Sequence, residues 1–450
     1  MLYIRSRFNS RRLFNWLATN FLCLLLAACG GGGGSSGSDL STRKTQDVAS
    51  NNGGDTPGDG STPGGGTTPG GGTTPGGGTT PGGGTTPGDG TTPGGGTTPG
   101  GGTTPGGGTT PGGGTTPGGG TTPGGGTLLP GLYLIADAVD NTGNMPPFST
   151  PHAITADKNG NLYVADTGNH TVRKITPDGV VTAFAGSSGN AGSTDGMGAN
   201  AKFNEPHGIT IDTDDNVYVA DRANHAIRKI TPAGYVTTLA GKTGESGSMD
   251  GPLADARFFE PSGIAVDKDN NLLVADTSNC TIRAIIAGTV STLAGTAKVC
   301  GHADGTGAAV KFDTPNAVTR AANGNLYVAD TGNHVIRTID FSSGKVSTRA
   351  GHEGLGEQAD GPGAKARFLA PFAITSDPDN NLYVADRDGH TIRKITAAGV
   401  TSTVAGVPKQ KGIALGNLAG GLSNPTGVHF LGGKTFVLTS DNMVLKLILP

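Results

Sequence analysis

The sequence predicts an all-β domain, a six-bladed β-propeller, on three observations. A proline recurs six times at spacings of 54 to 56 residues, at Pro151, Pro206, Pro261, Pro315, Pro371 and Pro425. Each unit then contains short runs rich in β-branched residues, separated by Asp, Asn and Gly, as is typical of antiparallel strands joined by turns. A four-stranded sheet cannot bury both faces alone, whereas six sheets stacked radially around a channel bury them against one another.

The first element of the chain is predicted to be a signal peptide, residues 1–28. Residues 1–12 carry four arginines and no acid, and the apolar run over 13–28 is shorter than the roughly 20 residues of a membrane-spanning helix. Residues 26–29 read Leu-Ala-Ala-Cys, which resembles the lipobox of bacterial lipoproteins. The resemblance implies palmitate-type acylation of Cys29, and Gly30 after it implies the outer membrane, on its periplasmic or surface face. An ordinary signal peptide with a chance cysteine is the alternative.

The second element, residues 29–126, is predicted to be a disordered linker. It holds 42 of the 82 glycines and 12 of the 28 prolines, mostly in Thr-Thr-Pro-Gly-Gly-Gly hexads between Asp55 and Gly126. Nothing in these hexads fills a core, so the entropy lost on ordering is not compensated. We therefore expect a flexible tether between the membrane and residues 127–450.

The third element, residues 127–450, contains the repeats, and its last unit is incomplete. Each unit is expected to form four strands, but the sixth ends after its third strand at Pro450. Upstream of the first unit, residues 132–137 read Leu-Tyr-Leu-Ile-Ala-Asp. We expect this segment to supply the missing fourth strand, which closes the ring and covers the edge of the last blade.

The repeated motif resembles the NHL repeat. Residues 163–175 read Tyr-Val-Ala-Asp-Thr-Gly-Asn-His-Thr-Val-Arg-Lys-Ile, with equivalents beginning at Tyr218, Leu273, Tyr327 and Tyr383. The sixth unit is degenerate, with residues 436–441 expected at the Tyr-Val-Ala-Asp position and Lys446 at the arginine. The resemblance implies a monomeric six-bladed propeller that commonly serves as an interaction platform. Related six-bladed folds include metal-dependent lactonases and a lyase, so the resemblance is also compatible with an enzyme.

Two charged residues recur in every intact unit and are interpreted as structural. The pairs are Asp166/Arg173, Asp221/Arg228, Asp276/Arg283, Asp330/Arg337 and Asp386/Arg393. A catalytic acid or base is needed once, whereas these occur in five blades. We expect the aspartate to hold the turn that follows it, and the arginine to bridge carboxylates or carbonyls across strands. The repeated histidines before the third strand are interpreted in the same way: His170, His225, His334 and His390.

Two further repeated patterns are also expected to be structural. Asp-x-Asp-x-Asn runs begin at Asp212, Asp267 and Asp377, but they lack the Gly and Glu of an EF-hand loop and are predicted as hairpin turns. Each loop between blades carries an acid and a base, such as Asp195 with Lys202, which we expect to pair at a solvated rim. The phenylalanine after that base is expected to pack between blades.

The position after each repeat proline breaks the symmetry. It is occupied by His152, His207, Ser262, Asn316, Phe372 and Thr426, in order. In a propeller this position enters the innermost strand near one mouth of the channel. His152, His207 and Asn316 are therefore candidates for binding a polar ligand or a divalent metal, with His429 as a weaker addition. Polar residues that simply line a hydrated mouth are the alternative.

The cysteines of the third unit predict a disulfide. Cys280 replaces the repeated histidine, and Cys300 follows the fourth strand of the same unit, so both fall on one face of the propeller. An exported protein favours pairing, and a loop of this length is stabilised by about 3 kcal/mol. A redox-active pair is the alternative, although such pairs are usually spaced more closely.

These observations favour a binding module over an enzyme. The formal net charge is −3 and aromatic residues make up 5% of the chain, which argues against a nucleic-acid partner. No nucleophile–base pair stands out, so no catalytic residue is predicted. We expect an envelope lipoprotein that binds an unidentified protein or glycan. A metal-dependent enzyme with its site at the channel mouth remains the second hypothesis.

Overall fold

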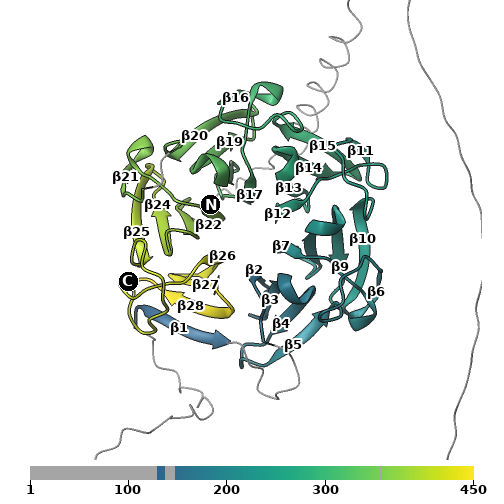
Figure 1. Cartoon of the computed structure of the whole chain (residues 1–450), viewed down its shortest axis with the longest axis horizontal. Helices are drawn as coiled ribbons and strands as arrows, with labels where there is room; N and C mark the ends of the chain where they lie inside the picture. Colours follow the sequence, from purple (N-terminus) through teal and green to yellow (C-terminus); the bar gives the residue numbers. More distant parts are fainter. Residues whose placement is uncertain (1–128, 137–146, 355–356) are drawn as a thin grey trace, which may run out of the picture. The chain divides into compact units, whose positions relative to one another are not determined.

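In the computed structural model of the protein, residues 129–136, 147–354 and 357–450 are described. The predicted signal peptide, Cys29 and the linker lie outside these residues. Within the described ranges, six antiparallel sheets surround a central channel as the blades of a propeller (Figure 1). The predicted fold is therefore confirmed.

Every blade has the same antiparallel strand order, from the channel to the rim. The innermost strands are β2 (Pro151–Ala156), β7 (Pro206–Ile211), β12 (Pro261–Val266), β17 (Pro315–Arg320), β22 (Pro371–Ser376) and β26 (Pro425–Gly432). The second strands are β3 (Leu162–Asp166), β8 (Val217–Asp221), β13 (Leu272–Asp276), β18 (Leu326–Asp330), β23 (Leu382–Asp386) and β27 (Thr435–Ser440). The third strands are β4 (Thr171–Ile175), β9 (Ala226–Ile230), β14 (Thr281–Ile286), β19 (Val335–Asp340), β24 (Thr391–Ile395) and β28 (Met443–Ile448).

The outer strands contain a feature that the sequence did not reveal. The fourth strands of the blades are β5 (Val181–Ala185), β10 (Tyr235–Gly241), β15 (Thr289–Ala294), β20 (Lys345–Gly351), β25 (Val400–Gly406) and β1 (Gly131–Ala136). Four blades gain a two-residue fifth strand from the preceding inter-blade loop: β6 (Gly196–Met197), β11 (Gly251–Pro252), β16 (Gly305–Thr306) and β21 (Gly361–Pro362). These strands cover the outer edge of the following blade, which protects it from pairing with another chain.

Short 3₁₀ turns connect the strands. Four follow the second strand, η1 (Thr167–Asn169), η3 (Arg222–Asn224), η4 (Thr277–Asn279) and η6 (Thr331–Asn333), and three lie in inter-blade loops, η2 (Gly198–Asn200), η5 (Gly307–Ala309) and η7 (Gly363–Lys365). The residue after each of the first four has left-handed backbone, for example His170 with φ 57°. In the third blade that residue is Cys280.

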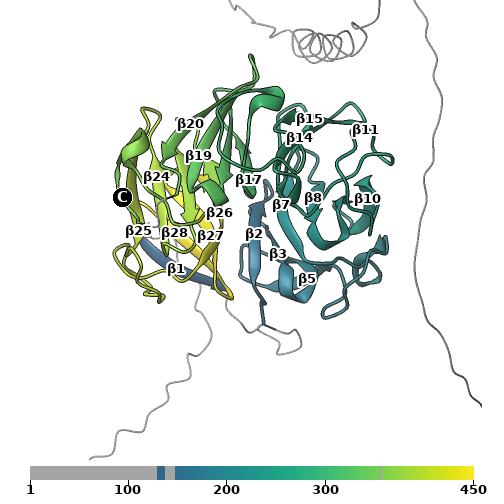
Figure 2. The same cartoon turned by 45° about the horizontal axis from the view of Figure 1, so that its top comes forward.

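The last blade is closed by the N-terminal strand, as predicted. β1 pairs antiparallel with β28, from Gly131 opposite Ile448 to Ala136 opposite Val444. Figures 1 and 2 both show the blue β1 beside the yellow strands of the last blade. Leu132 of β1 is buried in the core cluster that contains Phe436 and Leu447. The two ends of the domain are thus joined in one sheet.

The hydrophobic core is divided among the interfaces between neighbouring blades. One cluster joins Tyr163 and Ala165 of the first blade to Ile209 and Val219 of the second. Near the channel the second and third blades approach each other so closely that glycine is required in the second. A Cβ at Gly208 would lie 2.2 Å from the Ser262 carbonyl oxygen, which explains the glycine two residues after that proline.

The repeated Asp and Arg form buried ion pairs inside five blades, as expected. In the second blade Arg228 is fully buried and its Nη1 lies 2.6 Å from Asp221 Oδ2. The guanidinium stacks over Phe203 at 5.1 Å and donates to the Lys202 carbonyl. Asp221 Oδ1 in turn accepts the Asn204 N–H. The pair therefore ties the second strand to the loop that enters the blade.

Two expectations about charged positions need correction. The loop acid Asp195 pairs with the blade's Arg228 at 2.6 Å, and the same arrangement recurs at Asp250, Asp304 and Asp360, because the guanidinium has further N–H donors beyond those that bind the turn aspartate. Asp195 was expected to pair with Lys202. In the sixth unit the strand register places Ser440, opposite Pro425, at the aspartate position and Leu445 at the arginine position. Lys446 was expected there, so this blade lacks the ion pair.

The Asp-x-Asp-x-Asn segments are hairpin turns, as predicted. Asp212 Oδ1 accepts the N–H groups of Asp214 and Asn216, and its Oδ2 accepts the hydroxyl of Tyr218. The carboxylate is thus used by the turn itself.

Candidate functional site

The channel is lined by the free edges of the six innermost strands. Each of these strands pairs with a neighbour on one side only, so the backbone groups of its other edge face the axis. A cavity of about 440 Å³ runs between them and is bordered by residues of all six strands. The residue after each repeat proline borders the cavity, so the predicted mouth residues do lie at the channel.

Three aromatic rings from three blades meet at this mouth. The rings of His152 and His207 are stacked with centroids 4.0 Å apart. Phe372, from the fifth blade, lies 5.6 Å from each of them. His207 and Phe372 belong to opposite blades, so this contact spans the channel. We call these three side chains the mouth cluster.

Asn316 is placed differently from the two histidines. It is buried at the same level of the ring, and its amide donates to Thr331 Oγ1 at 3.1 Å. Thr331 Oγ1 donates in turn to the Pro371 carbonyl of the next blade. The amide of Asn316 is therefore used in a link between blades, while His152 and His207 are brought together.

Both histidines are neutral at neutral pH. Burial, aided by the charges of Arg222 and Arg387, lowers the pKa of His152 to about 4. Burial also holds the pKa of His207 well below its usual value, and the neighbouring His152 adds to this effect. His152 Nδ1 lies 2.8 Å from Thr167 Oγ1. Two neutral imidazoles stack without the repulsion that two imidazolium ions would suffer.

Two arginines beside the mouth cluster were missed by the sequence analysis. The residue after the repeated aspartate is Thr167, Thr277 or Thr331 in three blades, where its hydroxyl donates to the proline carbonyl of the next blade. In the second and fifth blades it is Arg222 and Arg387. Their signal in the sequence is the departure from threonine at this position of the repeat.

The two arginines are already paired. Arg222 bridges Glu205 at 3.0 Å and Glu260 at 2.7 Å. Arg387 lies 2.7 Å from Asp388 and stacks over Phe372 at 4.7 Å. The mouth therefore combines aromatic faces with compensated charges, which suits a ligand of low net charge.

The residues at the mouth do not fit a divalent metal. Catalytic zinc sites use three protein ligands, and His152 and His207 supply two. Across the part of the chain that the structure describes, a single group of three His, Cys, Asp or Glu side chains brings its ligand atoms together, namely Cys280, Cys300 and Asp313. The sulfurs of that group are joined to each other, so they are not free thiolates.

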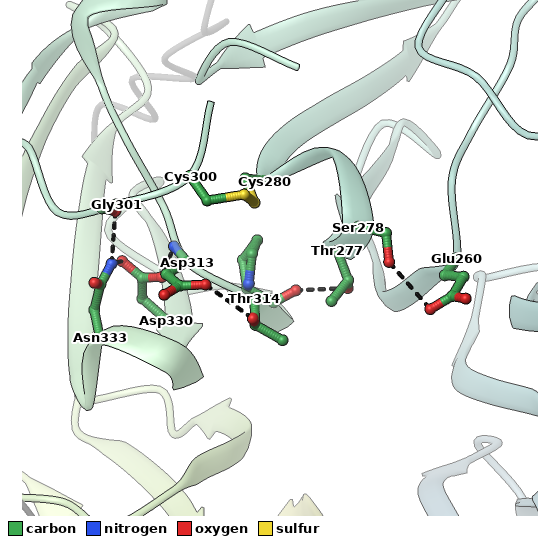
Figure 3. The surroundings of a disulfide bond; sticks show 11 residues. Glu260, Thr277, Ser278, Cys280, Cys300, Gly301, Asp313, Thr314, Asp330 and Asn333 are labelled. Carbon is green, nitrogen blue, oxygen red and sulfur yellow. Dashed lines mark hydrogen bonds between the residues drawn. A yellow bond between two sulfur atoms is a disulfide. The ribbon is translucent and has the colours of Figure 1, made fainter. Parts of the chain in front are cut away.

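The predicted disulfide between Cys280 and Cys300 is present (Figure 3). It links the turn after η4 to the loop after β15, with Cα atoms 5.3 Å apart. Asp313 lies beside it, and its backbone N–H donates to Asp330 Oδ1. The disulfide thus joins two connections on the same face of the third blade, next to the loop that leads into the fourth.

Within residues 129–136, 147–354 and 357–450, no helix is long and apolar enough to span a bilayer.

Comparison with known proteins agrees with the fold. The NHL repeat family model matches residues 148–175, 203–230 and 258–285. NHL repeat-containing protein 2 of Bos taurus is 30% identical over 284 residues, and the match covers 55% of this chain and 39% of that protein. The SUPPRESSOR OF QUENCHING 1 protein of Arabidopsis thaliana is 27% identical, and the match covers 62% of this chain and 28% of that protein. The chain thus spans well under half the length of these curated relatives.

Solved structures extend the likeness to the whole ring. A protein of unknown function from Bacteroides thetaiotaomicron aligns with a TM-score of 0.54 at 19% identity, over 72% of this chain and 76% of its own. An auxiliary nutrient binding protein from the same organism gives a TM-score of 0.52 at 14% identity, over 70% and 76%. At these identities the likeness shows the shared fold alone. This chain thus folds as a six-bladed β-propeller, and three stretches of its repeats are similar to the NHL repeat.

Proposed function

We propose that the protein is a bacterial envelope lipoprotein whose propeller binds a protein or glycan partner at the channel mouth. Residues 1–28 direct export, Cys29 carries the lipid and residues 29–126 act as the tether. The propeller, a monomer, then reaches a partner beyond the membrane surface. The sequence features of the first 126 residues support the anchoring half of this proposal, and the mouth cluster supports the binding half.

The observation that carries the binding proposal is the concentration of asymmetry at one mouth. Elsewhere the blades repeat the same aspartates, arginines and phenylalanines, which serve the fold. At this mouth His152, His207 and Phe372 meet across the ring, and Arg222 and Arg387 replace the threonines that link other blades. These substitutions place two guanidinium groups at the mouth where other blades have a hydroxyl, and both are held there by ion pairs.

The chemistry of the mouth suits a partner with an apolar or sugar face and few charges. Aromatic faces bind such groups, while Ser262 and the bridged Arg222 offer hydrogen bonds at the edge. The protein of similar fold described as an auxiliary nutrient binding protein is in keeping with a binding role. The metal-dependent enzyme has less support, because the mouth provides two histidine ligands.

Site-specific photo-crosslinking in intact cells tests the binding half. A photoreactive residue at Glu205 lies on the mouth face, and one at Lys158, in the first hairpin turn of blade one, lies on the opposite face as a matched control. We expect one specific adduct from position 205, lost in a His152→Ala/His207→Ala variant that still folds. Equal adducts from both positions, or none, would contradict the proposal.

The anchoring half is tested separately by Cys29→Ser. This variant should leave the membrane fraction and fail to incorporate labelled palmitate, whereas Cys23→Ser should behave like the wild type. A Cys29→Ser protein that stays in the membrane would show that the anchor lies elsewhere.

A further inference from the structure

A second polar ring lies inside the channel, four residues after each repeat proline. Its members are Thr155, Thr210, Ala265, Thr319, Thr375 and His429, and all of them border the cavity. Four of the six positions carry a hydroxyl and one carries an imidazole. This ring is distinct from the mouth cluster, which lies three residues earlier on the same strands.

The polar groups of this ring have no partner within the described part of the protein. Thr155 is 3% exposed and Thr375 is 9% exposed, and neither hydroxyl has a hydrogen-bond partner there. The His429 imidazole is unpartnered as well. None of these polar atoms is among the fully enclosed unpartnered atoms of the described residues, so they open onto the cavity, whose contents supply their hydrogen bonds.

The charge of the lining indicates an uncharged ligand. Of the described residues that border the cavity, none is an Asp or Glu, so a cation would lack a counter-charge. Arg320 borders the cavity but pairs with Asp267. Burial lowers the pKa of His429 to about 4, so its imidazole is neutral and accepts or donates a hydrogen bond without charge.

The far end of the channel provides the entrance. At the near end the three rings of the mouth cluster lie with their centroids 4.0 to 5.6 Å apart, which narrows the channel. At the far end a second cavity of about 420 Å³ shares Ala156, His429 and Phe430 with the channel. Asp157 and Lys158 also line this second cavity, and the Asp157 carboxylate accepts N–H groups of its own hairpin turn. Strand β26 has eight residues where the other innermost strands have six, and Leu431 near its end also lines this cavity.

We propose that the channel binds a small uncharged polyhydroxyl molecule, a monosaccharide or cyclic polyol, through Thr155, Thr375 and His429. The ligand enters at the far end, between the sixth and first blades. Its hydroxyl groups both donate and accept, which matches a ring of threonine hydroxyls and free strand edges. The cavity lies within the size range of small-molecule sites. The site is independent of any partner held at the mouth.

Isothermal titration of the purified protein tests this proposal. The probes are D-glucose, N-acetyl-D-glucosamine and myo-inositol, with D-gluconate and D-glucosamine as charged counterparts of similar size. We expect saturable binding of at least one uncharged probe, and binding of the charged counterparts at least about tenfold weaker, because the cavity offers no counter-charge. The sugar and inositol arms distinguish the two kinds of ligand.

Variants locate the binding. Thr155→Val and Thr375→Val keep the side-chain shape and should each weaken binding about fivefold through loss of one hydrogen bond. Thr171→Val is the matched control, because Thr171 is equally buried, has an unpartnered hydroxyl and lies away from the cavity. The proposal is overturned if no uncharged probe binds saturably up to tens of millimolar, if charged probes bind equally well, or if the two cavity variants behave like Thr171→Val.

Discussion

The imidazole rings of His152 and His207 lie stacked at 4.0 Å, joining the first and second blades at the channel mouth. This arrangement is stable while both rings are neutral. Arg222 and Arg387 lie close enough to disfavour a proton on either ring. Acidification would therefore place positive charges on the two stacked rings and beside the two arginines, and these charges would repel one another.

Acidification should destabilise the propeller through these histidines. The pKa of His152 is about 4 in the folded protein and 6.5 in the unfolded chain, so between these values the unfolded state binds more protons. The stabilisation is complete above pH 6.5 and declines as pH falls towards 4, by up to about 3 kcal/mol for His152 alone. Urea denaturation of the wild type and of His152→Gln/His207→Gln at pH 7 and pH 4.5 measures this loss of stability.

The double variant should show the smaller loss of stability between the two pH values. The buried aspartates of the blades titrate in both proteins, so their contribution cancels in the difference. Parallel pH profiles for the two proteins would mean that the rings are not buried neutral groups.

The buried pair of Arg228 and Asp221 should be essential to its blade. Replacing Arg228 by Met leaves the Asp221 carboxylate buried beside no cation, and such a loss costs about 3–5 kcal/mol. The surface pair of Lys158 and Asp215 is the control, and Lys158→Met should leave the free energy of unfolding nearly unchanged. Chemical denaturation compares the two. A similar loss of unfolding free energy in both variants would show that burial does not set the strength of the Arg228–Asp221 pair.

The architecture was predictable from the sequence because a propeller repeats its signals. Six prolines and five Asp–Arg pairs fix the number of blades, and the missing fourth strand in the last unit requires a donor, predicted as residues 132–137 and found as Gly131–Ala136. The short strands β6, β11, β16 and β21 were not predictable, because each has two residues, of which the first is Gly. Two residues are too few to show the polar–apolar alternation of a strand. In the sixth unit Ser440 occupies the aspartate position because of the register in which the strands pair. A degenerate motif does not reveal that register.

The site was predictable only in part. The position after the proline identified His152 and His207, but the approach of Phe372 from the fifth blade depends on the diameter of the ring. The role of Asn316 depends on its bond to Thr331, a contact between side chains of one blade that spacing along the chain does not specify. Arg222 and Arg387 were visible in the repeats, and their significance follows from the hydrogen bonds that the equivalent threonines make.

The disulfide between Cys280 and Cys300 should stabilise the third blade. The sequence separation is 20 residues, for which the chain-entropy model gives about 3 kcal/mol. A Cys280→Ser/Cys300→Ser variant should unfold at lower denaturant concentration than the wild type. The slope of its unfolding free energy against denaturant concentration should be unchanged. Peptide mapping without reduction should recover the two cysteines in one linked fragment. Two alkylatable thiols at these positions in the native protein would contradict the assignment.

Closure of the ring by β1 should depend on the buried Leu132 of that strand. Leu132 is 2% exposed in the core of the last blade, whereas Leu134 on the same strand is 42% exposed. Leu132→Ala should therefore cost about 2–5 kcal/mol, and Leu134→Ala within about 0.5 kcal/mol. Deleting residues 128–140 removes the strand altogether and leaves the edge of β28 unpaired, so the domain should melt at lower temperature and self-associate. Thermal melting and sedimentation measure these effects. A truncated propeller that melts like the parent and stays monomeric would show that the ring closes without β1.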